Sequence, residues 1–65
     1  MAWRVYLDID GDKEFLGSFP TREEAELVAE HAAEEEQEYV YVKDPDNTIV
    51  FRVNEPSEGL IYDEW

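Results

Sequence analysis

The stretch that decides the fold is Thr21–Glu38, TREEAELVAEHAAEEEQE. It predicts one helix, because Thr21 suits the N-cap position and Glu24, three residues later, completes a capping box. The residues that fall within about 60° of Ala25 on a helical wheel are apolar and mostly small. They are Val28, Ala29 and Ala32. We therefore expect this narrow stripe to let the helix lie close against a sheet.

The remaining surface of this helix is strongly acidic. Residues 21–38 carry eight glutamates and one arginine. Glu26, Glu30 and Glu34 repeat a like charge at i,i+4 spacing, which destabilises a helix. The glutamates at 34–36 meet the negative pole of the helix macrodipole, where a cation would be favourable. Unfavourable charge placements of this kind tend to mark functional positions, so the sequence indicates that this surface is a binding surface.

The segments around the helix alternate apolar and polar residues, which predicts β-strands. Four such segments are present, at residues 2–9, 14–19, 38–43 and 48–53. The Asp-Gly pair within 10–13 predicts a turn between the first two, and Asp-Pro-Asp-Asn at 44–47 predicts a turn between the last two. Gly17 interrupts the second strand and is typical of a bulge or of a close neighbour.

The alternation also predicts which side chains share a face. Phe15 and Phe19 are expected on one face of the second strand. Ile49, Phe51 and Val53 are expected on one face of the fourth. The face turned away from the helix is expected to carry Arg4, Tyr6, Tyr39, Tyr41, Val50 and Arg52.

The order β-β-α-β-β predicts an α+β fold of two layers, with one four-stranded, mainly antiparallel sheet and one helix on one face. We expect a single domain over residues 1–65, in which residues 54–65 form a loop and an apolar tail packed on the sheet. No second helix is predicted to cover the other face. The tail, a partner or a second copy in a homodimer is expected to do so.

The length and composition limit the classes of protein to which this chain could belong. Sixty-five residues without cysteine make one small domain with no disulfide or thiolate–metal site. No apolar run approaches the ~20 residues that a membrane span needs. Met1-Ala2-Trp3-Arg4 lacks the basic start and apolar block of a signal peptide. We therefore expect a soluble, cytoplasmic protein that binds no membrane.

The net charge of −13 argues against direct binding of nucleic acid, which needs a basic footprint. It favours attraction to basic proteins and to cations. The charge therefore directs the functional interpretation toward protein partners.

Residues 6–11, Tyr-Leu-Asp-Ile-Asp-Gly, resemble the strand-end Asp-x-Asp of haloacid-dehalogenase-type phosphatases, in which one Asp is the nucleophile and the other the acid. That family needs a large doubly wound domain, and Asp12 stands where it usually has Thr or Val.

Four alternate carboxylates also suggest a Ca²⁺ loop: Asp8, Asp10, Asp12 and Glu14. Lys13 and Phe19, however, occupy the positions where an EF-hand needs Gly and Glu. A strand that runs into an Asp-Gly turn accounts for the same residues.

His31 is the only histidine, and the helical wheel places it on the acidic face. A catalytic role would need a nucleophile or an orienting partner, and the sequence supplies neither. We expect a solvated surface histidine, and for the whole chain no enzymatic activity, no metal site and no cofactor.

In its length, its lack of cysteine, its one or two layers and its excess of Glu and Asp, the chain resembles the small acidic proteins that phages use against host defences. These include anti-CRISPR proteins that mimic DNA. The likeness is one of class, and no functional residue is carried over from a motif. It implies an inhibitor that blocks a DNA-binding surface of a host complex.

We interpret the chain as an acidic interaction protein that binds a basic surface of a nucleic-acid-binding protein, as a DNA mimic. Glu26, Glu30 and Glu34 would rise about 6 Å per step, similar to neighbouring phosphates on one strand. Leu27 within that face would act as an apolar anchor. The predicted partner-binding residues are Glu23, Glu26, Leu27, Glu30, Glu34, Glu35, Asp8, Asp10, Asp12, Asp44 and Asp46.

The acidity is also consistent with two different origins of the chain. A small domain from a halophile would be acidic for solubility alone, and only two lysines fit that pattern. A computational design would account for the capping box and the idealised turns. Designed surfaces usually mix Lys with Glu, however, and this one does not.

Overall fold

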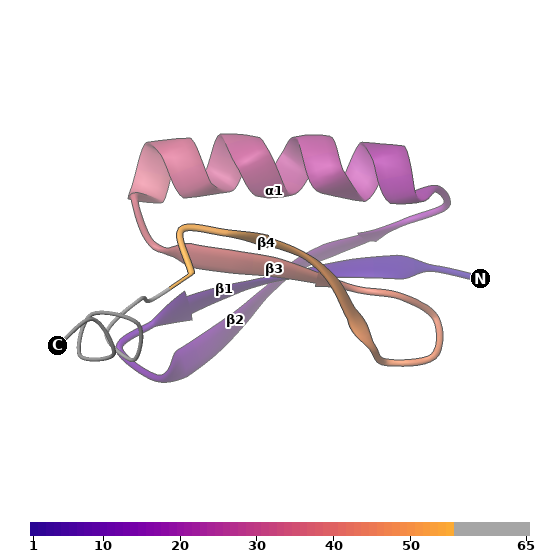
Figure 1. Ribbon diagram of the computed structural model, residues 1–65, viewed down its shortest axis with the longest axis horizontal. Coiled ribbons are helices and arrows are strands. Elements are labelled where there is room, and N and C mark those ends of the chain that lie inside the picture. Colours follow the sequence, from indigo (N-terminus) through magenta and orange to yellow (C-terminus); the bar gives the residue numbers. More distant parts are fainter. Residues whose placement is uncertain (56–65) are drawn as a thin grey trace, which may run out of the picture.

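The computed structural model describes residues 1–55 and shows two layers, a sheet and a helix that lies across one of its faces (Figure 1). The elements within these residues are β1 (Trp3–Ile9), β2 (Asp12–Phe19), α1 (Arg22–Glu36), β3 (Tyr39–Lys43) and β4 (Ile49–Val53). The predicted α+β class and the β-β-α-β-β order are therefore confirmed. The predicted packing of the tail concerns residues 56–65, which lie outside the described residues.

The strands are ordered β2-β1-β3-β4, and every neighbouring pair is antiparallel. The helix therefore connects the edge strand β2 to β3, which lies on the other side of β1. It packs mainly over β1 and β3 at the centre of the sheet. These strands supply the large side chains of the core, Val5, Leu7, Val40 and Val42.

The first hairpin turns more tightly than the sequence suggested. Asp10 and Gly11 both have positive φ, 53° and 91°. A two-residue loop with this geometry matches the twist of the strands it joins. β2 consequently begins at Asp12, two residues before the predicted start. The turn is held by Asp8, whose Oδ1 accepts a hydrogen bond from the Gly11 N–H at 3.0 Å.

Bulges in the two edge strands overturn part of the predicted face assignment. At Gly17 the pairing shifts, so that Val5 opposes Gly17 but Tyr6 opposes Phe15. Phe15 therefore lies on the face away from the helix, and Phe19 packs against the core. The extra residue of the bulge reverses the alternation between the two phenylalanines.

A second bulge lies in β4. Val42 opposes Phe51 and Lys43 opposes Ile49, which leaves Val50 as the extra residue. Val50 packs against the core, although alternation had assigned it to the open face. Ile49 takes that place instead, because it shares the face of Lys43.

The helix begins and ends with side-chain and backbone caps. The Thr21 hydroxyl accepts a hydrogen bond from the Glu24 N–H at 3.2 Å, which confirms Thr21 as the predicted N-cap residue. At the other end Gln37 takes a left-handed φ of 54°, and its N–H donates to the Ala33 carbonyl at 2.7 Å. The left-handed residue stops the helix at Glu36, before the predicted end at Glu38.

The buried stripe of the helix consists of alanines alone. Ala25, Ala29 and Ala33 are at most 1% exposed. Ala33 was missed by the sequence analysis, whereas Val28 and Ala32 are only partly buried at the flank of the stripe. The stripe is thus an i,i+4,i+8 row, rotated slightly from its expected position. None of the helices in the described part of the chain has the length and apolarity to cross a membrane.

Replacing Ala29 with leucine is expected to lower the free energy of unfolding by about 1–3 kcal/mol, because the side chain would have to enter a filled helix–sheet contact. Denaturant unfolding followed by circular dichroism measures the change. The control is Leu27→Ala on the exposed side of the same helix, which should change it by no more than about 0.5 kcal/mol. Equal effects of the two changes would show that the alanine stripe is not closely packed.

Candidate functional site

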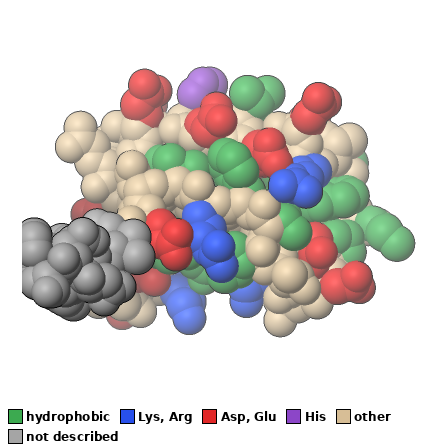
Figure 2. Space-filling view, in the orientation of Figure 1, with side chains coloured by type: hydrophobic (Ala, Val, Ile, Leu, Met, Phe, Trp, Pro, Cys, Tyr) green, Lys and Arg blue, Asp and Glu red, His purple; other side chains and the backbone are tan. Residues whose placement is uncertain are grey.

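Charged side chains are sorted between the two faces of the molecule. Seven glutamates and one arginine lie on α1. The other four lysine and arginine residues lie on the sheet, and their strand pairing places them on the face away from the helix. Figure 2 shows acidic side chains and the histidine along the helix, at the top of the view, with most of the blue side chains below them. The helix is thus strongly acidic, whereas the cations lie on the sheet, together with eight further carboxylates of residues 1–55 that lie in the strands and loops.

The outer side of α1, which we call the acidic helix face, consists of Glu23, Glu24, Leu27, Glu30, His31 and Glu34, all of them exposed. Leu27 is 57% exposed and is one of few large apolar side chains left open in residues 1–55. It lies in a shallow hollow of about 400 Å³ whose other lining residues are glutamates. The face thus presents an apolar side chain surrounded by carboxylates.

One predicted member of this surface is already engaged. Glu26 pairs with Arg22, with Nε and Oε2 separated by 2.6 Å. Arg22 also donates to the Val50 carbonyl at 3.0 Å, which ties the helix to β4. Glu26 is therefore partly neutralised, and Glu30 and Glu34 remain as the free carboxylates of the predicted row. Glu35 is exposed on the β2 side of the helix, beside Glu36 and Leu16.

The predicted turn aspartates do not lie on one side of the molecule. Asp10 and Asp12 lie at the β1–β2 turn, whereas Asp44 and Asp46 lie at the β3–β4 turn, at the opposite end of the sheet (Figure 1). Asp44 is occupied within its own turn, because its Oδ1 accepts hydrogen bonds from the N–H groups of Asp46 and Thr48, at 2.9 and 2.8 Å. The aspartates therefore do not extend the acidic helix face as one continuous field.

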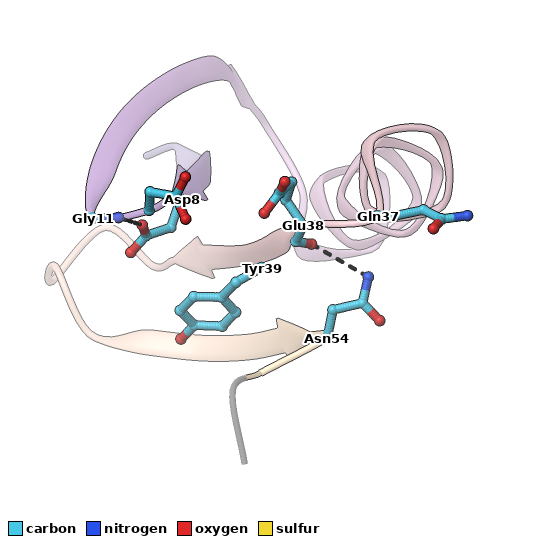
Figure 3. Close-up of a pocket in the computed structure, with 7 residues that line it drawn as sticks. Asp8, Gly11, Gln37, Glu38, Tyr39 and Asn54 are labelled. Atoms are coloured by element: carbon cyan, nitrogen blue, oxygen red, sulfur yellow. Dashed lines mark hydrogen bonds between the residues drawn. The ribbon is translucent and has the colours of Figure 1, made fainter. Parts of the chain in front are cut away.

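A hollow of about 440 Å³ opens at the end of the sheet where α1 finishes (Figure 3). Its lining residues come from β1 and its turn, from the helix C-terminus, from β3 and from the end of β4. They are Asp8, Asp10, Gly11, Gln37, Glu38, Tyr39 and Asn54. The Asn54 amide donates to the carbonyls of Ala33 and Glu38, both at 3.3 Å, and so joins the helix end to β4.

This end hollow combines carboxylates with the negative end of a helix, and so it favours cationic groups. Within residues 1–55, however, no three histidine, cysteine or carboxylate side chains are arranged to hold a metal ion. Asp8, the first Asp of the phosphatase-like segment, caps the hairpin turn instead. The described residues form a single antiparallel sheet in place of the doubly wound domain that such phosphatases need.

The face of the sheet away from the helix, which we call the open sheet face, carries a row of aromatic rings. Phe15, Tyr6, Tyr41 and Tyr39 follow one another across β2, β1 and β3, with ring centroids 5.6, 5.5 and 5.3 Å apart. These separations suit favourable ring–ring contacts. The row closes over Tyr41, which is only 3% exposed, although its side chain points away from the core.

Cations surround this aromatic row. The Lys43 ammonium lies 5.7 Å from the centroid of the Tyr6 ring, a cation–π distance. Arg4 donates to the Asn47 carboxamide at 3.3 Å. Arg52 opposes Tyr41 in the sheet register, and Lys13 opposes Asp8. The alternation did not predict the two lysines and Phe15 on this face, and only the bulge signal of Gly17 could have placed Phe15 there.

The chain matches no family model, and a comparison of the chain with curated proteins and with solved structures finds no match.

Burial raises the pKa of Tyr41 above its ordinary value of 10.0, and the nearby Asp8 carboxylate adds to the effect. The unfolded chain loses this proton at a lower pH, so the folded state binds more protons in the alkaline range. The free energy of unfolding should therefore fall as pH rises above about 10. Denaturant unfolding at pH 8 and pH 11 tests this. Tyr41→Phe should reduce the alkaline loss, and an unchanged loss would contradict the assignment.

Glu34→Lys is expected to raise the free energy of unfolding by about 0.3–1 kcal/mol at low salt, because it places a cation near the negative helix end and removes a repulsion with Glu30. Glu23→Lys is the matched control, since it makes the same charge change in the first turn, where an anion is favourable. It should have a smaller or opposite effect. Thermal unfolding in 20 mM and 1 M NaCl measures both, and the difference should shrink at high salt.

Proposed function

We propose that this chain is a non-enzymatic interaction protein whose acidic helix face binds a basic surface of a nucleic-acid-binding protein, in the manner of a DNA mimic. The observation that carries the proposal is the separation of charge. The carboxylates of α1 are balanced on the helix only by Arg22, while the other cations of residues 1–55 lie on the opposite face.

The separation matters because opposite charges placed side by side would cancel each other's field. On the acidic helix face the field is left unbalanced, which accelerates association with a positively charged partner. Arg22 neutralises part of Glu26 at one flank and leaves Glu23, Glu30 and Glu34 free. These three carboxylates are the core of the proposed contact.

Leu27 supplies an apolar contact, which the charged residues cannot provide. Ion pairs at an exposed surface contribute little affinity, and binding energy is usually concentrated in a few desolvated side chains. At 57% exposure, Leu27 has most of its apolar surface still to bury. The surrounding glutamates would form the polar rim of the contact, which excludes water from its centre.

The glutamate-rich C-terminal half of α1 is consistent with this role. Glu34–Glu36 lie in the last turn of the helix, and no basic residue accompanies them there. A basic partner would relieve both the repulsion among these carboxylates and their unfavourable position on the helix dipole. Binding would then recover stability that the free protein lacks.

A competition experiment tests the proposal. Immobilised chain is incubated with basic nucleic-acid-binding proteins enriched on heparin, and bound proteins are challenged with excess short duplex DNA. We expect duplex DNA to release them, because a DNA mimic and DNA would occupy the same site. The triple variant Glu23→Gln, Glu30→Gln, Glu34→Gln should lose at least tenfold in captured protein, and Leu27→Ala should also weaken capture.

The matched control is Asp12→Asn, Asp46→Asn, Glu55→Gln, which removes the same charge outside the acidic helix face. It should capture nearly as much protein as the unmodified chain. Equal losses in the two triple variants would mean that only the net charge matters. Capture that duplex DNA fails to displace would contradict mimicry.

A further inference from the structure

Two surfaces of the described residues are left without a partner, and their properties are complementary. Apart from the terminal Met1, the exposed large apolar side chains are Phe15, at 56%, and Leu27, at 57%. Phe15 lies on the open sheet face and Leu27 on the acidic helix face, on opposite sides of the molecule. Phe15 shares its face with four cations, and Leu27 is surrounded by carboxylates.

The open sheet face fits an anionic partner with an apolar projection. Phe15 lies beside Tyr6, with ring centroids 5.6 Å apart, at one end of the aromatic row. The cations of this face are Arg4, Lys13, Lys43 and Arg52, and among the strand residues that share it only Asp8 is acidic. A convex acidic surface centred on a leucine would bring carboxylates to the cations and apolar atoms to the rings.

The acidic helix face has these properties. Leu27 projects from a convex helix, with Glu23 and Glu30 one turn away on either side. The carboxylates of this face have no cation within it, and the four cations of the open sheet face are free of strong ion pairs within residues 1–55, since Arg52 approaches Glu55 only to 3.8 Å. Each surface therefore supplies the charge that the other lacks.

We propose that the open sheet face docks the acidic helix face of a second copy of this chain, in a head-to-tail contact that places Leu27 of one copy against Phe15 and Tyr6 of the next. Such a contact is heterologous, because two different surfaces meet. A pair of copies keeps one free surface of each kind, so the assembly grows into short chains or closes into a ring.

Charge complementarity favours this occupant over the alternatives. Two open sheet faces packed together would place cation against cation, which costs energy on both sides. Single-stranded nucleic acid would meet aromatic rings and cations, but it would approach a molecule with a net charge of −13. A second copy carries the same net charge, and salt screens the long-range repulsion beyond about 8–10 Å for either occupant, but the second copy also offers Leu27, an exposed apolar side chain, to the aromatic rings.

The contact is small. Four strands about 4.8 Å apart span roughly 19 Å across the sheet, and the two shorter strands, of five residues each, extend over about 17 Å. Interfaces of this size lie at the weak end of the specific range. The association should therefore appear at high protein concentration, and at intermediate salt, where repulsion between whole molecules is screened but contact pairs persist.

The inference is independent of the proposed function, although both use the acidic helix face. A basic partner bound to that face would stop growth of the assembly, because the two occupants exclude each other. A chain that self-associates but captures no basic protein would leave this inference standing and overturn only the proposed function.

Sedimentation velocity over about 20 µM to 1 mM chain, in 150 mM NaCl, tests the contact with two complementary variants. The helix variant is Leu27→Ala with Glu30→Gln, and the sheet variant is Phe15→Thr with Lys13→Gln. All four changes are at exposed positions, and circular dichroism checks the fold. We expect the unmodified chain to grow beyond a dimer and each variant alone to remain monomeric. An equimolar mixture of the two should form dimers but nothing larger, because only one intact contact is possible.

Asp46→Asn with Glu14→Gln, outside both surfaces, serves as the matched control and should associate as the unmodified chain does. A mixture that stays monomeric while the unmodified chain associates would overturn the head-to-tail contact. Dimers formed by the helix variant alone would do so too, in favour of two sheets packed together. An unmodified chain that is monomeric up to 1 mM, or one that binds a single-stranded 12-mer without self-association, would also overturn it.

Discussion

The close approach of α1 to the sheet is the contact on which the rest of this structure depends. Ala25, Ala29 and Ala33 occupy the buried side of the helix and leave room for the larger side chains of β1 and β3 beneath them. A domain of this size has little apolar surface to bury, so each of these contacts is a large part of its stability. The alanines are small, and the helix backbone itself can therefore lie close to the strands.

The same contact determines what each outer surface can carry. Because one narrow stripe suffices to dock the helix, its other positions are free to be acidic. Because the inner face of the sheet holds the apolar core, most alternate polar positions and the tyrosines of β1 and β3 point outward. The concentration of carboxylates on the helix and of cations on the open sheet face is compatible with the two-layer build, and both proposed interactions depend on it.

The fold class, the element order and most of the core could be predicted because they depend on periodicity and local turn chemistry. The Asp-Gly turn, the Thr21 cap and the alternation in β1 and β3 are local signals, and all were confirmed. The acidic helix face could be predicted for the same reason, since helical spacing alone places Leu27 among the glutamates. Two predicted carboxylates of that face were misplaced: Glu26 pairs with Arg22, which donates to a carbonyl of β4, and Glu35 lies on the β2 side of the helix.

The residues of the open sheet face could be predicted only in part, because bulges and strand order are not encoded in any single strand. A bulge adds one residue and reverses the alternation beyond it, so Phe15 and Ile49 moved to the outer face and Val50 to the inner one. Gly17 signalled one bulge, whereas β4 contained no such residue. The strand order, and with it the aromatic row across three strands, follows from pairing between distant segments.

The sequence by itself determined the charge, the periodicities and the caps, and hence a helix acidic on one side above an antiparallel sheet. Only the tertiary structure decided which strands are neighbours, where the register shifts, and therefore that the cations gather around four aromatic rings opposite the glutamates. The physical reason is range. Helical and strand periodicity act between residues a few positions apart, whereas register and strand order are fixed by contacts between segments far apart in the chain.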